Sequence, residues 1–293
     1  MKMIPKYPIY VVSKGRYEPN TRLTARSLEE MKCPYNIIVN ENEFDQYQNA
    51  TDKRYGTVLI QPQKYFDEYD MFWNDDNKVT GPGAARNFAW DHSIENGHEF
   101  HWVMDDNIQG FARLNRNEKL LVKSPSIFRA MEDFCYRYSN IAMAGPNYRF
   151  FASQNSKLPP YSMNTRIYSC NLIRNDTPYR WRGRYNEDTD LSLRMLKDGW
   201  CTVQFYAFLQ NKVGTQQIKG GNTDQFYSKE GTYLKSKMLL DMHPDVTKLV
   251  YKFGRPHHYV NYSGYRQKLK LKNNITVKKG INEYGMKLVT IEK

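Results

Sequence analysis

Short apolar runs alternate with helix-like segments over the first hundred residues, and this alternation limits the possible folds more than any other feature. The apolar runs are residues 8–13, 35–39, 57–60 and 100–104. Apolar residues recur at helical spacing between them, at 20–32, 42–49 and 80–96. The pattern predicts an α/β fold with a doubly wound, mostly parallel sheet and helices on both faces. Ligands of such sheets bind at the carboxyl ends of strands, so the candidate site residues are Ser13–Arg16, Asn40 and Asp105–Asn107.

The second half of the chain is also mixed. We expect helices at 127–138, 187–198 and 229–241, and strands at 140–144, 166–173 and 201–208. Residues 62–80 and 146–165 are predicted loops, and the Gly220-Gly221 pair marks a break. Asn74-Asp75-Asp76-Asn77 lies in the first of these loops, with no apolar strand before it. Residues 266–293 are expected to form a strand pair or a flexible arm.

Composition allows one large domain and points to an anionic partner. The 293 residues are 40% hydrophobic, which permits a substantial core. The formal net charge is +12, and residues 248–293 carry eleven Lys and Arg against two Glu, or +9 of it. A basic excess of this size suggests a polyanion but fixes no function. The four cysteines are far apart and no apolar run would span a membrane, so we expect reduced thiols and a cytoplasmic protein.

The segment W-V-M-D-D-N-I at 102–108 carries the clearest chemistry. An apolar strand runs directly into Asp105, Asp106 and Asn107. Carboxylate and amide oxygens suit a divalent cation such as Mg²⁺ or Mn²⁺, which would stabilise a leaving diphosphate. An isolated string of this kind is more often a solvated turn or a helix cap, so its context decides. The string leaves open which of the two aspartates binds metal directly.

Two further segments supply that context. G-P-G-A-A-R-N at 81–87 resembles the small-residue helix that precedes the acidic strand in glycosyltransferases of the GT-A type. Arg86 would there pair with phosphate or hold the acidic loop. N-E-D-T-D-L-S-L-R at 186–194 resembles the E-D-x-D segment of the same enzymes, which supplies a general base. The resemblance gives Asp188 that role, with Glu187 as the competitor, although helix capping alone would explain two acids in a first turn.

A histidine pair lies in G-R-P-H-H-Y at 254–259. GT-A enzymes often bring a late histidine into the metal or diphosphate site. His257 and His258 are therefore predicted metal ligands together with Asp105 and Asn107. A single histidine is more often structural, and only the adjacent pair in a basic segment raises the expectation of a ligand.

These pieces together resemble the TET-associated glycosyltransferases, GT-A-like enzymes encoded largely by bacteriophages. P-I-Y-V-V-S-K-G-R at 8–16 and the G-G and H-P-D region at 220–245 add to the motifs above, and the resemblance covers roughly residues 5–260. It implies a GT-A-like domain over 1–260 and a basic C-terminal extension over 261–293. The substrates it implies are a nucleotide-sugar, expected to be a UDP-hexose, and DNA containing a hydroxymethylated pyrimidine such as 5-hydroxymethylcytosine, in the host cytoplasm. The donor-binding residues it implies are Ser13, Lys14, Arg16, Arg86, Asp105 and Asp106.

The acceptor side is predicted from charge and aromatic content. Arg182 and Arg184 would bind DNA phosphates without reading sequence, while Trp181 and Tyr185 would stack on a flipped base. Packing inside the fold is an equally good expectation for each ring. Three alternatives stay open: a glycan, lipid or protein acceptor, a GT-A-like nucleotidyltransferase, and a non-catalytic basic nucleic-acid-binding protein. No protein partner is expected.

Overall fold

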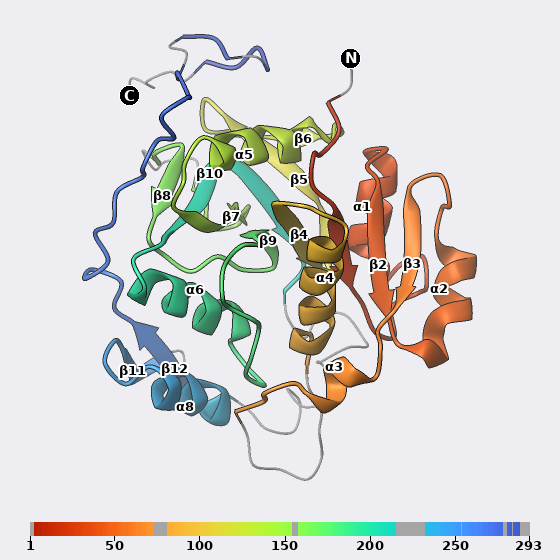
Figure 1. The fold of residues 1–293 in the computed structure, drawn as a ribbon, viewed down its shortest axis with the longest axis horizontal. Helices are drawn as coiled ribbons and strands as arrows, with labels where there is room; N and C mark the ends of the chain where they lie inside the picture. Colours follow the sequence, from red (N-terminus) through yellow and green to blue (C-terminus); the bar gives the residue numbers. More distant parts are fainter. Residues whose placement is uncertain are drawn as a thin grey trace.

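A computed structural model describes residues 3–72, 81–153, 158–214, 232–252, 254–277, 280–282 and 284–287. Its main feature is a ten-stranded sheet in the order β3-β2-β1-β4-β9-β7-β10-β5-β6, with β8 also paired to β10 (Figure 1). Helices lie on both faces. The predicted α/β class with a doubly wound sheet is confirmed. The predicted loop acids at 74–77 and the Gly220-Gly221 pair lie outside the described residues.

The first half of the sheet is parallel and follows the predicted strands closely. β1 (Ile9–Val12) pairs with β2 (Tyr35–Val39) and β4 (Phe100–Asp105), and β2 pairs with β3 (Gly56–Ile60). The connections carry α1 (Leu23–Glu30), η1 (Glu41–Glu43) with α2 (Phe44–Ala50), a short α3 (Lys64–Asp67) and α4 (Gly83–Glu95). Parallel neighbours need such crossovers, which is why strand–helix alternation predicts this half well.

The second half is mixed. β9 (Cys170–Arg174) runs antiparallel between β4 and β7 (Ile141–Tyr148), and β10 (Cys201–Lys212) is parallel to β7. β5 (Ile108–Asn115) and β8 (Tyr161–Met163) run antiparallel to β10, and β6 (Glu118–Val122) completes the edge. Seven strands, β1–β4, β6, β7 and β10, therefore point the same way. Two helices, α5 (Ser126–Tyr136) and α6 (Glu187–Lys197), belong to this half.

The sequence patterns missed the β5–β6 hairpin. Its two-residue turn is Arg116-Asn117, and both residues have positive φ, 49° and 64°. This is the geometry of a tight hairpin turn, in which Asn-Gly or Asp-Gly is the usual sequence signal. An Arg-Asn turn gives no such signal. The strand predicted at 166–173 begins only at Cys170, and α3 lies in a predicted loop.

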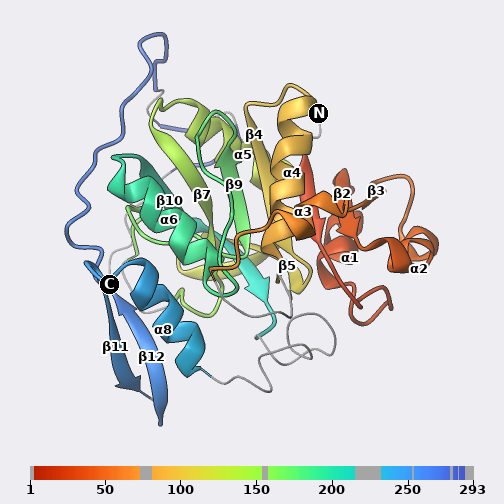
Figure 2. The same cartoon turned by 60° about the horizontal axis from the view of Figure 1, so that its bottom comes forward.

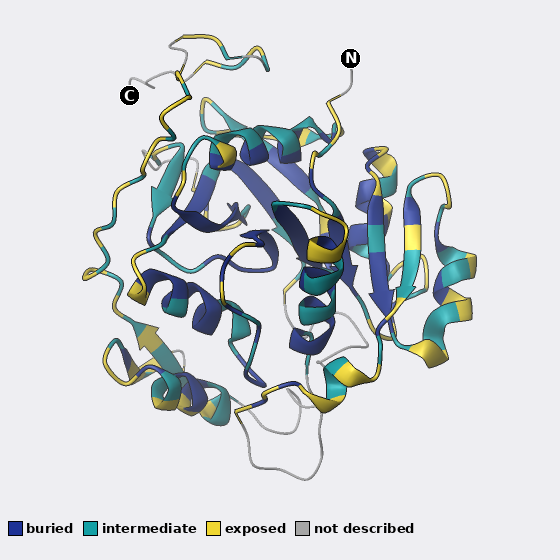
Figure 3. Ribbon diagram, viewed as in Figure 1, coloured by how far each residue is buried: buried dark blue, intermediate teal, exposed yellow. Residues whose placement is uncertain are grey.

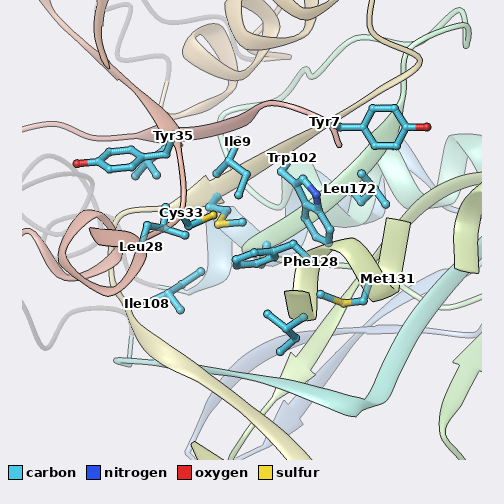
Figure 4. Close-up of a cluster of buried hydrophobic side chains, with 14 of the residues drawn as sticks. Tyr7, Ile9, Leu28, Cys33, Tyr35, Trp102, Ile108, Phe128, Met131 and Leu172 are labelled. Carbon is cyan, nitrogen blue, oxygen red and sulfur yellow. The ribbon is translucent and has the colours of Figure 1, made fainter. Parts of the chain in front are cut away.

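Two apolar layers enclose the sheet. On one face α1, α2 and α5 cover a cluster that includes Leu28, Trp102 and Phe128 (Figure 4). The Trp102 and Phe128 rings meet edge to face, 5.4 Å apart. On the other face α4 and α6 cover a second cluster, which Val103 reaches from the same strand as Trp102. Because successive strand residues face opposite sides, burial on both faces explains the continuous apolar runs of the sequence.

The C-terminal part packs against this core. α8 (Tyr233–Met242) contacts a two-stranded sheet of β11 (Thr247–Lys252) and β12 (Arg255–Val260), so the strand pair lies upstream of the predicted position (Figure 2). Residues 265–272, here named the C-terminal strap, are extended along the domain. The Asn140 side chain donates to the Lys268 carbonyl oxygen (2.9 Å) and accepts from the Lys270 N–H (2.8 Å). The strap is mostly exposed or half-buried, unlike the central strands (Figure 3).

Two simpler expectations concern the thiols and the membrane. All four cysteines are free and buried. Within the described residues, none of the helices has both the length and the apolar composition needed to cross a bilayer.

Candidate active site

The site lies where β1, β4, β7 and β10 present their carboxyl ends at one edge of the sheet. The turn after β4 is held by Thr24 at the start of α1. Its hydroxyl donates to the Asp105 carbonyl oxygen (2.6 Å) and accepts from the Ile108 N–H (2.8 Å), while its own N–H donates to the Asp106 carbonyl oxygen (3.1 Å). A single threonine thus fixes the acidic turn, so the directions of the side chains at 105–107 are set by the fold.

Arg86 is the centre of the site. It lies in the first turn of α4, with its side chain 2% exposed. It donates to Asp105 Oδ1 at 2.7 Å, to Glu187 Oε1 at 3.0 Å and to Asp188 Oδ1 at 2.9 Å. Of the two roles open to Arg86 from the sequence, it holds the acidic residues in this structure. One guanidinium therefore joins three carboxylates from β4 and the first turn of α6.

Close packing brings α4 to this position. A Cβ atom added at Gly83 would meet the Tyr69 hydroxyl oxygen at 1.8 Å, so no side chain fits there. Tyr69 in turn donates to the Gly183 carbonyl oxygen at 2.8 Å, which ties this end of α4 to the segment before α6. Ala84 and Ala89 are fully buried against the sheet. The small residues of the motif therefore serve close approach of the helix to its neighbours.

The carboxylates differ in their electrostatic surroundings. Burial acts to raise the pKa of Asp105, but the cations Lys212 and Arg86 outweigh it and lower that pKa below its usual value. Burial and the adjacent Asp188 carboxylate raise the pKa of Glu187 to about 7, against the opposing effect of Arg86. Asp105 is therefore a fixed anion, whereas Glu187 can gain or lose a proton near neutral pH.

Lys212 is a site residue that the sequence did not reveal. It ends β10, and its ammonium lies 2.5 Å from Asp105 Oδ2 and 2.7 Å from Ser169 Oγ. The Ser169 hydroxyl also shares a hydrogen bond with the Tyr148 hydroxyl (2.7 Å). No motif surrounds Lys212, and the predicted strand ended at 208. Only the extension of β10 to Lys212 places this lysine at the carboxyl end of a strand.

A second network lies beside the first, at the end of β1. Ser13 Oγ donates to Asp106 Oδ2 (2.8 Å) and shares a hydrogen bond with the Tyr47 hydroxyl (2.7 Å), and Arg16 forms an ion pair with Asp106. Burial raises the pKa of Asp106, although Arg16 acts in the opposite direction. The neighbouring Lys14 side chain is exposed. The predicted donor-binding residues thus converge on one edge, with Asp105 and Asp106 turned to different networks. Asn40, the remaining strand-end candidate, precedes the short η1 helix and is half-buried.

The residues as they lie do not fit a divalent cation at Asp105, because Arg86 and Lys212 bind its two oxygens. Asn107 Oδ1 is buried with no hydrogen-bond partner among the described residues, while Nδ2 donates to the Val213 carbonyl oxygen (3.2 Å). A hard divalent cation needs several oxygen ligands, and the Asn107 amide would supply one. In the part of the chain that the structure describes, no group of three or more His, Cys, Asp or Glu side chains is arranged to hold a metal.

The predicted histidines lie on β12, and cationic side chains surround His258. Burial lowers the pKa of His258 to about 4, and Arg166, Lys235 and His257 act in the same direction. The Lys235 backbone lies near the start of α6, because its carbonyl oxygen accepts a hydrogen bond from the Asn186 side chain (2.7 Å). Burial lowers the pKa of Lys235, whereas the carboxylates of Glu187 and Asp188 act to raise it. His258 is therefore uncharged near neutral pH, and it lies close to Lys235, a cation that borders the two carboxylates.

The predicted acceptor-binding residues are largely internal. Trp181 is 1% exposed with Arg86 over its ring at 4.6 Å, and Tyr185 is 1% exposed beside Met238. Arg182 is bound to the buried Asp190 (3.1 Å), and Arg184 is buried. The two rings have no exposed face for a base here, which favours the packing expectation. Their role in binding DNA stays a prediction without support from this placement.

In a comparison with protein families, residues 7–221 match the family described as TET-Associated Glycosyltransferase. The match covers well over half of the chain. The chain belongs to the TET-associated glycosyltransferases. No match is found among curated proteins. As a member of this family the chain is assigned to the glycosyltransferases, and the matched region contains every residue of the Arg86 cluster. The histidine pair on β12, helix α8 and the C-terminal strap lie outside it.

Proposed function

We propose that this protein transfers a hexose from a nucleotide-sugar, expected to be a UDP-sugar, to the hydroxyl of a hydroxymethylated pyrimidine in DNA. The observation that carries the proposal is the convergence of Asp105, Glu187 and Asp188 on Arg86, in a chain whose family transfers sugars. A fixed anion and an adjacent titratable carboxylate are the parts that sugar transfer needs at an acceptor hydroxyl. The net charge of +12 supports a polyanionic acceptor.

In the proposed reaction a carboxylate takes the proton of the acceptor hydroxyl. The acceptor oxygen then forms a bond to the sugar C1, and the bond from C1 to the diphosphate oxygen breaks, which releases the nucleoside diphosphate. Nearby cations would stabilise the charge that develops on that leaving group. Arg86 holds the three carboxylates together by hydrogen bonds, and the Lys212 ammonium also binds Asp105.

Asp188 and Glu187 are both proposed for the base. Asp188 was favoured by the resemblance, but its oxygens already accept from Arg86 (2.9 Å) and from the Ser169 N–H (3.3 Å). Glu187 has a pKa raised to about 7, by burial and the neighbouring Asp188, which matches a base that works near neutral pH. We therefore expect Glu187→Gln to abolish the rise of kcat through about pH 7, with Asp188→Asn as the matched comparison.

The deciding experiment is mass spectrometry of DNA containing 5-hydroxymethylcytosine after incubation with a panel of UDP-sugars. A mass increase of one sugar in the wild type, absent in the Glu187→Gln/Asp188→Asn double variant, supports the proposal. Donor hydrolysis without a modified base would point to a glycan or protein acceptor. DNA binding with neither transfer nor hydrolysis would point to a non-catalytic binding protein.

Metal dependence stays a prediction from the sequence. Arg86 and Lys212 bind the two carboxylate oxygens of Asp105. A divalent ion would therefore bind this carboxylate only after Lys212 had moved. Transfer is measured with the protein freed of metal by a chelator and again after addition of Mn²⁺ or Mg²⁺. Recovery only with the metal supports the prediction, whereas full activity in chelator shows that protein cations suffice.

A further inference from the structure

Two adjacent phenylalanines lie exposed at the edge of the candidate active site. Phe150 and Phe151 directly follow β7, whose carboxyl end lies at the same sheet edge as those of β4 and β10. Their exposed fractions are 63% and 51%. Exposed apolar residues usually occur singly, whereas a continuous apolar patch marks a surface that binds something.

The two rings form one patch with Tyr148 beneath them. Phe150 stacks on Tyr148 with ring centroids 5.1 Å apart and planes at 23°, and Phe151 lies 4.3 Å from Phe150 and 5.8 Å from Tyr148. We call Tyr148, Phe150 and Phe151 the aromatic platform. Tyr148 connects it to the Arg86 cluster, because its hydroxyl shares a hydrogen bond with Ser169, which also binds Lys212.

The backbone fixes the platform in place. The Arg149 N–H donates to the Gln210 carbonyl oxygen of β10 (2.8 Å), and the Phe151 N–H donates to the Tyr148 carbonyl oxygen (3.1 Å), which closes a turn. The Gln210 side chain also donates to the Pro146 carbonyl oxygen (2.9 Å). An aromatic surface that is ordered before binding loses little conformational entropy when a flat ligand stacks on it.

Cations surround the platform. The Lys212 ammonium lies 5.9 Å from the Tyr148 ring centroid, and Arg149 lies between Tyr148 and Phe150 in the chain. The Tyr168 ring centroid lies 4.3 Å from that of Tyr148, and the Arg166 guanidinium lies over the Tyr168 ring, 5.0 Å from its centroid. Flat apolar rings among positive charges match a strand of nucleic acid, whose bases stack while its phosphates are neutralised.

We propose that Phe150 and Phe151 form the stacking surface for an unpaired base of the DNA acceptor, at or next to the base that receives the sugar. The identity of the ligand as acceptor DNA rests on the proposed function, whereas the geometry of the platform does not depend on it. It replaces Trp181 and Tyr185, whose rings are buried, with rings that have exposed faces. In duplex DNA the base would have to leave the helix to reach the platform, as in other enzymes that modify bases.

The test uses Phe150→Leu, Phe151→Leu and the double variant, which keep apolar volume but remove the aromatic face. Binding of a fluorescently labelled single-stranded oligonucleotide with one 5-hydroxymethylcytosine is measured by anisotropy, and steady-state kinetics give KM for both substrates. Each lost base stack should weaken oligonucleotide binding roughly 5- to 100-fold. KM for the oligonucleotide should rise, KM for the nucleotide-sugar should not, and Phe150→Tyr should restore binding.

Tyr251→Leu is the matched control, because Tyr251 is 74% exposed on β11 and outside the platform. Unchanged oligonucleotide affinity in the folded double variant overturns the platform, even if the wild type transfers sugar. Equal losses in the double variant and in Tyr251→Leu overturn it too. Conversely, weaker binding in the platform variants with no sugar transfer by the wild type keeps the platform and rejects the proposed function. A wild type that does not bind DNA rejects both.

Discussion

Replacing Arg86 by methionine should destabilise the protein strongly and in a pH-dependent way. The guanidinium is 2% exposed and binds three carboxylates at 2.7–3.0 Å, and one of them, Asp105, also pairs with Lys212. Removing one partner of a buried ion pair costs about 3–5 kcal/mol. Since domains are stable by roughly 5–15 kcal/mol, we expect Arg86→Met to lose a large part of the free energy of unfolding near pH 8.

The pH dependence follows from the carboxylates left behind. In the wild type the pKa of Glu187 is raised to about 7 by burial and Asp188, above its ordinary value of 4.5. A raised carboxyl pKa gives stability that is complete below the unfolded pKa and is lost as pH rises through the folded pKa. Without Arg86 that folded pKa rises further, so the loss continues to higher pH. The destabilisation by Arg86→Met should therefore be larger near pH 8 than near pH 5.

Urea unfolding followed by tryptophan fluorescence measures both effects, and Trp181 lies directly under Arg86. Arg54→Met is the control, because Arg54 pairs with Asp52 on the surface with its side chain 77% exposed. It should change the free energy of unfolding little at either pH. A loss below about 1 kcal/mol in Arg86→Met near pH 8, or an equal loss at both pH values, would refute the idea that Arg86 neutralises buried carboxylates.

Three further predictions concern activity and binding. Lys212→Met leaves Asp105 with Arg86 as its cation and removes one charge from the proposed donor site. Calorimetry should then show an affinity for the nucleotide-sugar reduced roughly tenfold, about the contribution of one charged hydrogen bond. Unchanged affinity contradicts a role of Lys212 in donor binding. Glu187→Gln removes a group whose pKa is raised to about 7, so stability should no longer fall between about pH 4.5 and 7, and a persisting fall in the urea series assigns it to another group. Arg266, Lys268 and Lys270 are exposed at alternate positions of the C-terminal strap; changing all three to glutamine should lower the slope of log binding constant against log salt by up to about 2.7, at about 0.9 per phosphate contact, and an unchanged slope excludes the strap from DNA binding.

Much of the fold was accessible from local patterns. β2 matches its predicted bounds, and β1, β3, β4 and α6 lie within a residue or two of theirs. The β5–β6 hairpin was not, because its Arg116-Asn117 turn lacks the residues that usually adopt positive φ. The C-terminal strap was equally hidden. Its extended backbone is bound largely by Asn140 and Asn164, more than a hundred residues away, and no pattern within residues 265–272 shows that contact.

The α/β class, the acidic turn at the end of β4 and the membership of the family follow from the sequence alone, because periodicity, capping and motifs are local properties. Three features appear only in the folded chain: Arg86 binds three carboxylates, Lys212 pairs with the same Asp105, and Trp181 is buried while Phe150 is exposed. These depend on the order of strands in the sheet, with β9 antiparallel between β4 and β7. Strand order is fixed by burial and pairing summed over the whole domain, and a short segment does not carry that information.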